Sequence, residues 1–163
     1  CILIYHPVTD LKYDINFEIT EIINTLISEK TNCIVIYPNS DLGSSYIYEN
    51  YNKLRNNSNF VLFKNLDYLD FISLLKNSEY IIGNSSAGII ESSYLCTPSI
   101  NIIGRQRNRT KGKNVIDCDP KMENIKKAIK TINTKKFRDE IIKTKNIYGD
   151  QTFIDKIWSD LNA

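Results

Sequence analysis

The chain has 163 residues, the size of one domain whose sheet and covering helices can bury a full core. Its 21 basic and 19 acidic side chains leave a net charge of +2, which argues against a protein that binds nucleic acid or a membrane surface. No stretch approaches the roughly 20 consecutive apolar residues of a membrane helix, and the first residues do not resemble a signal peptide.

The first two predicted strands are short apolar runs that end at polar residues. Residues 2–5 form the first strand, and Pro7 prevents a helix there, so His6, the only histidine, lies at the strand's carboxyl end. Apolar residues then recur at helical spacing from 17 to 27. The second strand is predicted at 33–37.

The loop after the second strand, residues 38–44, again places polar side chains beyond a strand's carboxyl end, with Asn39 among them. Ser44 is expected to cap a helix that runs to Arg55. A third strand follows at 60–63. The next helix is expected to bury an apolar stripe made of Tyr68, Leu69, Phe71, Ile72, Leu74 and Leu75.

The most informative stretch follows a fourth strand at residues 80–82. Gly83 closes this strand, and the apolar spacing then becomes helical, which predicts a tight turn and a helix that begins at Ala87. Backbone N–H groups at such a helix start, with the hydroxyls of Ser85 and Ser86 beside them, can hold a phosphate.

Two further residues of this stretch fit a nucleotide. Glu91 would lie one helical turn beyond Ala87, where its carboxylate can accept hydrogen bonds from a ribose diol, and Gly88 leaves room for close approach. The turn lacks the lysine of a P-loop, and Ala87 interrupts the glycine–serine–glycine pattern of a serine hydrolase. Ser85 and Ser86 as plain helix caps are the alternative interpretation.

A fifth strand at 99–103 leads into a loop with three arginines. Charged hydrogen bonds contribute about 1.5–3 kcal/mol each, against about 0.3–1 kcal/mol for a helix dipole, so this loop should dominate the affinity for an anion. Arg105, Arg107 and Arg109 alternate, so an extended loop would put them on one side. We expect Arg105 to bind a ligand and Arg107 to face water.

The rest of the chain adds a sixth strand at 114–117, a helix from Pro120 to Thr131 and another helix at 134–145. A last helix is predicted at 152–161. Four apolar side chains are expected to pack this helix on the body: Phe153, Ile157, Trp158 and Leu161.

Strands and helices alternate along the whole chain. This alternation predicts an α/β fold, a doubly wound open parallel sheet of about six strands with helices on both faces. Ligands of such sheets bind beyond the carboxyl ends of the strands, and all the polar clusters described above follow strands. We therefore expect one site that gathers them.

His6 has three candidate roles: the base of a serine hydrolase with Ser85, a neutral structural group, or a proton donor to a phosphate or leaving group. The cysteines offer no comparable chemistry, because they are far apart in the sequence and have no histidine at metal-ligand spacing. Neither a metal site nor a disulfide framework is expected, and buried free thiols in a reducing cytoplasm are the simplest account.

Five motifs now stand together: His-Pro-Val-Thr at 6–9, Pro-Asn-Ser-Asp at 38–41, Gly-Asn-Ser-Ser-Ala-Gly-Ile-Ile-Glu at 83–91, Thr-Pro at 97–98 and Arg-Gln-Arg-Asn-Arg at 105–109. They resemble the C-terminal half of the UDP-N-acetylglucosamine 2-epimerases, over nearly the whole chain. The Asn-Ser-Ser turn and the later Arg-Gln pair are similar to the hydrolysing branch of that family.

The resemblance implies a two-domain GT-B-like enzyme of which residues 1–163 are a single C-terminal, nucleotide-binding domain. The N-terminal domain, with the catalytic carboxylates, would lie outside this chain, and the abrupt start at Cys1 fits a piece of a longer protein. The implied reaction converts UDP-GlcNAc or a related UDP-acetamido sugar to an N-acetylmannosamine-type sugar and UDP, for sialic acid or cell-surface polysaccharide. The full protein would be a cytoplasmic homo-oligomer without a cofactor, and this chain alone would be inactive.

The resemblance also implies roles for single residues. Ser85 and Ser86 would hold the diphosphate, Glu91 the ribose, and the backbone at 63–66 the uracil. The residues expected to bind UDP are Asn39, Phe63, Ser85, Ser86, Glu91, Arg105, Gln106 and Arg109, and the expected catalytic residue is His6. Two other functions stay open: half of a UDP-sugar glycosyltransferase, and a non-catalytic nucleotide-binding module.

Overall fold

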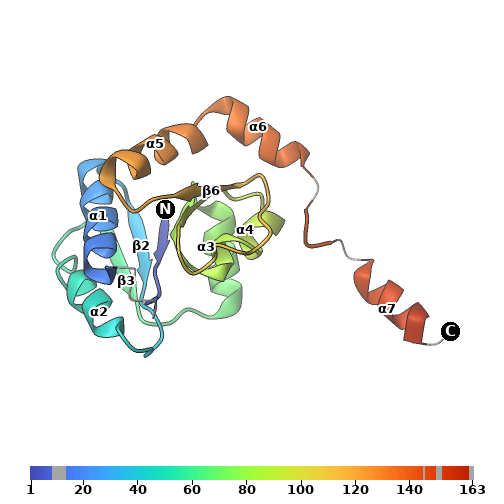
Figure 1. Cartoon of the computed structure of the whole chain (residues 1–163), viewed down its shortest axis with the longest axis horizontal. Coiled ribbons are helices and arrows are strands. Elements are labelled where there is room, and N and C mark those ends of the chain that lie inside the picture. The colour runs from blue at the N-terminus through green and yellow to red at the C-terminus, as the bar shows by residue number, and fades with distance from the viewer. Residues whose placement is uncertain (9–13, 145, 150–151, 162–163) are drawn as a thin grey trace.

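The computed structural model describes residues 1–8, 14–144, 146–149 and 152–161, and it contains one sheet of six strands (Figure 1). All the pairings are parallel, in the order β3-β2-β1-β4-β5-β6. The strands are β1 (Ile2–Ile4), β2 (Cys33–Ile36), β3 (Phe60–Phe63), β4 (Ile81–Gly83), β5 (Ser99–Ile102) and β6 (Val115–Cys118). The predicted fold class is confirmed.

Helices cover both faces of the sheet (Figure 1). They are α1 (Ile15–Ser28), α2 (Ser44–Asn52), α3 (Tyr68–Asn77), α4 (Glu91–Tyr94), α5 (Met122–Ile132), α6 (Lys135–Lys143) and α7 (Phe153–Leu161), with a 3-10 turn η1 (Ser86–Gly88) before α4. Side chains of β1 alternate between the two cores. Leu3 packs with residues of α1, α2 and α5, whereas Ile2 and Ile4 pack with residues of α3 and η1.

The order in which strands are added to the sheet reverses at the boundary between β1 and β4. The chain first builds outward from β1 through β2 to β3, and then returns to the other side of β1 and builds outward to β6. Ile2 is therefore paired with Ile34 on one side and with Ile81 on the other. The loops that follow β1 and β4 diverge at this point, which is where open parallel sheets bind ligands.

The starts of α2 and α5 differ from the prediction. The cap of α2 is Gly43, which has a left-handed backbone (φ +90°), so Ser44 is the first helical residue and not the cap. Helix α5 begins two residues after Pro120, and the Met122 N–H donates to the Glu21 carboxylate of α1 at 2.8 Å. The group that caps α5 is 101 residues away in the chain, so no local sequence pattern predicts this cap.

The predicted buried stripe of α3 is wrong in its first turn. Tyr68 and Leu69 are 64% and 80% exposed, and Leu75 is the buried residue of this helix. Phe71 and Leu74 reach the core made by Ile2, Ile4 and Ile81, because the later turns of α3 are the ones that lie over those strands. The first turn extends beyond them.

Helix α7 does not pack on the body, contrary to expectation, and Figure 1 shows it standing away from the sheet and its helices. Ile157, Trp158 and Leu161 are 43%, 69% and 75% exposed, and the side chain of Phe153 lies outside the described ones. The predicted core position of Trp158 is therefore wrong. Both faces of the sheet are already covered by earlier helices, which explains why α7 finds no place there.

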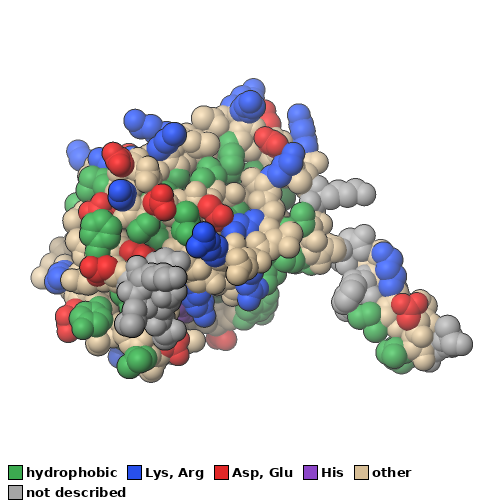
Figure 2. Space-filling view, in the orientation of Figure 1, with side chains coloured by type: hydrophobic (Ala, Val, Ile, Leu, Met, Phe, Trp, Pro, Cys, Tyr) green, Lys and Arg blue, Asp and Glu red, His purple; other side chains and the backbone are tan. Residues whose placement is uncertain are grey.

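The surface in view carries basic and acidic side chains interspersed, as the near-zero net charge suggests (Figure 2). None of the helices in the described residues is long and apolar enough to cross a membrane. All four cysteines are free. Burial raises the pKa of the Cys33 thiol to about 12 and that of Cys118 to about 11, whereas Cys96 is exposed, which corrects the expectation of a buried thiol there.

Candidate functional site

The predicted site residues lie along the carboxyl edge of five adjacent strands. Phe63 ends β3, Asn39 follows β2, and His6 follows β1. The remaining ones come after β4 and β5: Ser85, Ser86, Glu91, Arg105, Gln106 and Arg109. Because the strands are parallel and in this order, the loops emerge side by side on one edge of the sheet.

The turn after β4 is pressed against β1. Gly83 has φ +135°, and a Cβ atom there would lie 1.9 Å from the carbonyl oxygen of Ile4. The next backbone N–H, that of Asn84, donates to the same Ile4 oxygen at 3.2 Å. Only glycine allows this approach, so Gly83 sets the position of the hydroxyl-bearing turn relative to β1.

Asn84 connects three loops of the site. Its side chain is 1% exposed, accepts from the His6 N–H at 2.7 Å and donates to the His6 carbonyl at 2.8 Å. The Gln106 side chain in turn donates to the Asn84 carbonyl at 3.1 Å. The loops after β1, β4 and β5 are therefore held together, which brings His6, Ser85 and Gln106 into one cluster.

Asn84 was not among the residues predicted to form the site. The signal for it was present, since a polar residue directly follows the glycine that ends a buried strand. What its amide bonds to depends on the pairing of β1 with β4, which a single sequence does not display. Its role is to hold the other residues in place.

The helix predicted from Ala87 is interrupted. Residues 86–88 form the turn η1, capped by Ser85, whose hydroxyl accepts from the Ala87 N–H at 3.3 Å, and α4 then begins at Glu91 and ends at Tyr94. The capping interpretation thus holds for Ser85. A helix of this length has little macrodipole. Gly88 faces β5 and not open space, because a Cβ atom there would meet the Ser99 hydroxyl at 2.9 Å.

His6 is half-buried beside the arginine loop. Burial, and then the positive charge of Arg105, lower the pKa of its imidazole below the ordinary 6.5, while the Asp41 carboxylate partly opposes this shift. His6 is therefore neutral at pH 7. Electrostatic coupling to both residues shows that the loops after β1, β2 and β5 approach one another here.

Several buried polar atoms at this edge have no hydrogen-bond partner. Among the described residues of this edge, these orphan atoms are His6 Nδ1, Glu91 Oε2, Asn101 Oδ1 and Gln106 Oε1. Glu91, Asn101 and Gln106 follow or lie within β4, β5 and their loops, and all three present acceptor oxygens. Such groups are costly unless a donor satisfies them, so a ligand rich in O–H and N–H groups, or water, fits this edge.

The arginine loop is folded and not extended as expected. The Arg107 N–H donates to the Gly104 carbonyl and the Arg109 N–H to the Gln106 carbonyl, each at 3.3 Å, so two tight turns follow each other. Arg105, Arg107 and Arg109 are all exposed. Arg105 acts on His6, whereas Arg109 acts on Tyr148, whose pKa burial raises and Arg109 lowers.

The site is an open edge. Two hollows lie elsewhere: one of about 440 Å³ lies between α1 and α5, and one of about 400 Å³ lies at the opposite end of β2 and β3. His6, Ser86, Glu91 and Arg105 line neither of these hollows. The one site that was expected to gather these residues is therefore neither of these hollows.

Comparisons with known proteins converge on one family. The family described as UDP-N-acetylglucosamine 2-epimerase matches residues 1–162. A UDP-N,N'-diacetylbacillosamine 2-epimerase (hydrolyzing) of Legionella pneumophila is 33% identical over 151 residues, which are 92% of this chain and 39% of that protein. A UDP-N-acetylglucosamine 2-epimerase of Neisseria meningitidis is 35% identical over 128 residues, which are 78% of this chain and 34% of that one.

Solved structures share the fold. The UDP-GlcNAc 2-epimerase of Methanocaldococcus jannaschii, in complex with UDP-GlcNAc and UDP, superposes with a TM-score of 0.74 at 21% identity, over 99% of this chain and 44% of that one. The Neisseria meningitidis enzyme bound to UDP-GlcNAc gives a TM-score of 0.68 at 18% identity, over 98% and 43%. The chain therefore spans about two fifths of the length of these relatives.

Proposed function

Because this chain belongs to the UDP-N-acetylglucosamine 2-epimerase family, we propose that it is the UDP-binding half of a hydrolysing 2-epimerase. The substrate would be UDP-GlcNAc or a related UDP-acetamido sugar, and the products an N-acetylmannosamine-type sugar and UDP. The Legionella pneumophila relative, whose name includes "hydrolyzing", supports the hydrolysing branch, as does the Arg105-Gln106 pair. Since the chain has about two fifths of the relatives' length, turnover would need the rest of the protein.

One observation carries the proposal: orphan acceptor oxygens and an arginine gather where the loops after β1, β4 and β5 are joined by Asn84. A uridine nucleotide matches this arrangement, because its ribose and sugar carry hydroxyl donors and its diphosphate needs cationic partners. We assign the buried oxygen of Glu91 to the ribose diol. Ser86 and Arg105 would contact the diphosphate, and the backbone near Phe63 the uracil.

The proposed reaction begins with elimination. A base removes the proton from C2 of the sugar, a double bond forms between C1 and C2, and the C1–O bond breaks to release UDP. Water then adds across the double bond, with its oxygen at C1 and a proton at the opposite face of C2. The residues of this chain would act on the leaving group, and the base that takes the C2 proton would come from outside it.

Departure of UDP develops negative charge, and this chain has two groups beside that position. The Arg105 guanidinium is permanently charged and exposed at the edge, ready to pair with phosphate oxygens. Neutral His6, whose Nδ1 lacks a partner, can donate a hydrogen bond from a ring N–H to the departing oxygen. Both groups stabilise charge that is larger in the transition state than in the bound substrate.

The binding half of the proposal is tested by titrating UDP into this chain in a calorimeter. Arg105→Ala is expected to weaken UDP binding by about 10- to 100-fold, and Ser86→Ala by less, because the arginine supplies a charged hydrogen bond. Arg55→Ala is the matched control, since Arg55 is exposed and bonds within its own helical segment, to Asn52. Equal affinity for UDP in all three variants would contradict the assignment of Arg105 and Ser86 to the diphosphate.

The catalytic half is tested on the full-length protein. UDP-GlcNAc is incubated with it in the absence of any acceptor, and the products are separated. Free UDP together with a 2-epimerised free sugar supports the hydrolysing epimerase. A nucleotide sugar that returns epimerised but intact indicates the non-hydrolysing reaction, and turnover only in the presence of a sugar acceptor indicates a glycosyltransferase.

A further inference from the structure

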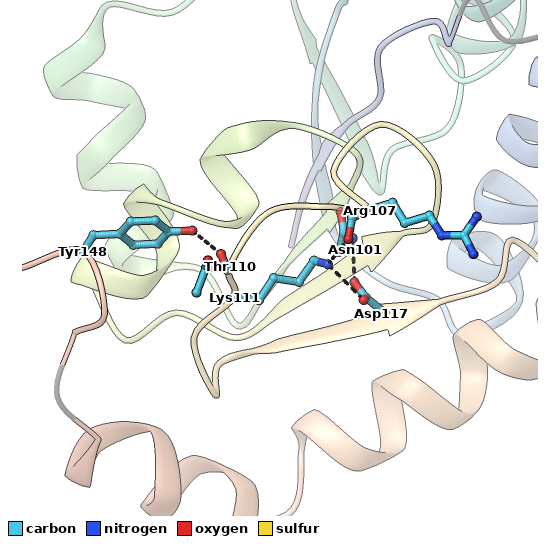
Figure 3. Close-up of polar contacts among 6 residues, drawn as sticks. All are labelled: Asn101, Arg107, Thr110, Lys111, Asp117 and Tyr148. Atoms are coloured by element: carbon cyan, nitrogen blue, oxygen red, sulfur yellow. Dashed lines mark hydrogen bonds and ion pairs between the residues drawn. The ribbon is translucent and has the colours of Figure 1, made fainter.

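The arginine loop is fixed at its far end by a polar cluster, the loop clamp, which consists of Lys111, Asp117 and Asn101 (Figure 3). The Lys111 ammonium donates to the Arg107 carbonyl at 3.1 Å and pairs with the Asp117 carboxylate, also at 3.1 Å. The other carboxylate oxygen of Asp117 accepts from the Asn101 amide at 2.7 Å. One ammonium thus joins the loop backbone to two strands.

The loop clamp is anchored in the rigid part of the fold. Asn101 and Asp117 are paired residues of β5 and β6, and Asn101 is 2% exposed. The Lys111 side chain is 16% exposed and the Asp117 side chain 46% exposed, so the lysine is held largely out of water while solvent still screens the pair from the Asp117 side. Figure 3 shows the lysine extended between the Arg107 backbone and Asp117, with the Arg107 guanidinium pointing away.

Besides the Tyr148 hydroxyl, which donates to the Thr110 carbonyl at 2.5 Å, the loop is held at two adjacent residues of one backbone turn. Gln106 attaches it to the Asn84 carbonyl, and Lys111 attaches it through the carbonyl of Arg107, the next residue. Arg105 directly precedes both attachment points and lies near enough to His6 to depress its pKa. Without Lys111, the Arg107 carbonyl is left to water and the turn after Gln106 loses its support from the sheet.

We propose that Lys111 is a positioning residue that orients the Arg105 guanidinium toward the His6 cluster, with Asp117 and Asn101 as its support. Only the identity of the anion that Arg105 meets rests on the proposed function. The positioning itself is a property of the free chain. Lysine suits this role because it offers three donors on a long stem, of which two are used here.

The first experiment needs no ligand. Amide hydrogen exchange is followed by mass spectrometry in wild type, Lys111→Met and the matched control Lys113→Met. Lys113 lies in the same segment but pairs with Glu140 of α6 at the surface. Lys111→Met is expected to speed exchange at residues 105–110 by about 10-fold, with β4 and α1 unchanged, and Lys113→Met should leave 105–110 as in wild type. Equal exchange in the two variants overturns the proposal.

The second experiment measures coupling to Arg105 with UDP as the probe. Lys111→Met is expected to weaken UDP binding by about 3- to 10-fold in wild type but by less than about 2-fold when Arg105 is already alanine. The same loss in both backgrounds means that Lys111 acts on the ligand by its own charge, and the proposal fails. If wild type does not bind UDP, the proposed function fails and the exchange experiment still decides the positioning.

Asp117→Asn is the second variant, in case Lys111→Met does not fold. It keeps an oxygen for the Asn101 amide but removes the charge that holds Lys111. Faster exchange at 105–110 in Asp117→Asn, at an unchanged melting temperature, supports the loop clamp. Exchange at the wild-type rate contradicts it.

Discussion

A buried asparagine organises the candidate site at the scale of single residues. Asn84 uses both ends of its amide on the His6 backbone and its carbonyl on Gln106, so the cluster depends on a side chain that points into the protein. The sequence predicted the residues around it, because hydroxyls, carboxylates and arginines have recognisable ligand chemistry. It did not single out Asn84, since asparagine is equally common in plain turns.

Asn84→Ala is expected to lower the free energy of unfolding by about 2–4 kcal/mol, because it leaves buried backbone groups of His6 without partners. Urea denaturation measures this change. Asn39→Ala, at an exposed position of the neighbouring loop, should change stability by less than about 0.5 kcal/mol. If Asn84→Ala also changed the free energy of unfolding by less than about 0.5 kcal/mol, the loops after β1, β4 and β5 would not depend on Asn84.

His6 makes ligand binding depend on pH. In the free chain burial and Arg105 keep the pKa of His6 below 6.5, and a bound diphosphate would raise it. At a pH between the His6 pKa of the free chain and that of the complex, UDP binding should therefore take up a proton. The affinity for UDP should rise as pH falls through this range. Calorimetry in two buffers of different ionisation enthalpy detects the proton. His6→Gln should abolish this uptake, after which only the titration of UDP itself remains.

Glu18 makes stability depend on pH in a different range. Its buried carboxyl accepts a hydrogen bond from the Tyr5 hydroxyl, yet burial outweighs this bond and raises the pKa of Glu18 above its ordinary 4.5. A raised pKa favours the protonated folded state, so this stability is fully present below pH 4.5 and is lost as pH rises through the folded-state pKa.

Glu18→Gln keeps an acceptor for Tyr5 without the buried charge, so it should be at least as stable as wild type at pH 7 and show a flatter pH profile. Glu18→Leu should lose about 1–3 kcal/mol, because the Tyr5 hydroxyl is left unpaired. Urea denaturation from pH 4 to pH 8 gives both quantities. A wild-type profile retained in Glu18→Gln would rule Glu18 out as the titrating group.

At the scale of elements, apolar runs located the strands well, and β3 has the predicted bounds of 60–63. The ends of helices were less predictable, because their capping groups are often supplied by other parts of the fold. Glu21 of α1 caps α5, and Gly43 replaces the expected serine at α2. The folded form of the arginine loop depends in the same way on contacts with β6 and Asn84.

Two glycines with positive φ can be compared: Gly83, which ends β4, and Gly149, which follows α6. Gly83→Ala is expected to destabilise the chain by more than about 3 kcal/mol, because its Cβ would overlap the Ile4 carbonyl. Gly149→Ala has a similarly unusual φ of +97° but meets no atom within 4 Å, so only about 1 kcal/mol of backbone strain is expected. Thermal unfolding of both variants separates close approach from backbone strain. Similar losses would contradict the contact between β4 and β1.

At the scale of the whole molecule, alternating strands and helices were enough to predict the doubly wound sheet. They predicted α7 as a helix but not its exposure, since its spacing is amphipathic and its described side chains stay largely exposed. An amphipathic pattern states that a face is available for burial, and it does not identify what covers that face. The same reasoning failed for Tyr68 and Leu69 of α3.

A chain that ends at Gly149 should therefore be almost as stable as the full chain. Because the described side chains of α7 are exposed, its removal is expected to change the free energy of unfolding by about 0.5 kcal/mol or less, which corresponds to about 2 °C or less in melting temperature. Differential scanning calorimetry of the two chains measures it. A drop of many degrees would show that α7 contributes to the folded body in solution.

The place of β1 in the sheet also has a consequence during synthesis. Among the strands of this sheet β1 is synthesised first, yet one of its two neighbours, β4, is made about 80 residues later. At about 5–20 residues per second, the nascent strand waits roughly 4–16 s with one edge open. An apolar strand exposed in this way is a binding site for chaperones, so the order of translation gives this fold a vulnerable interval that the finished protein no longer has.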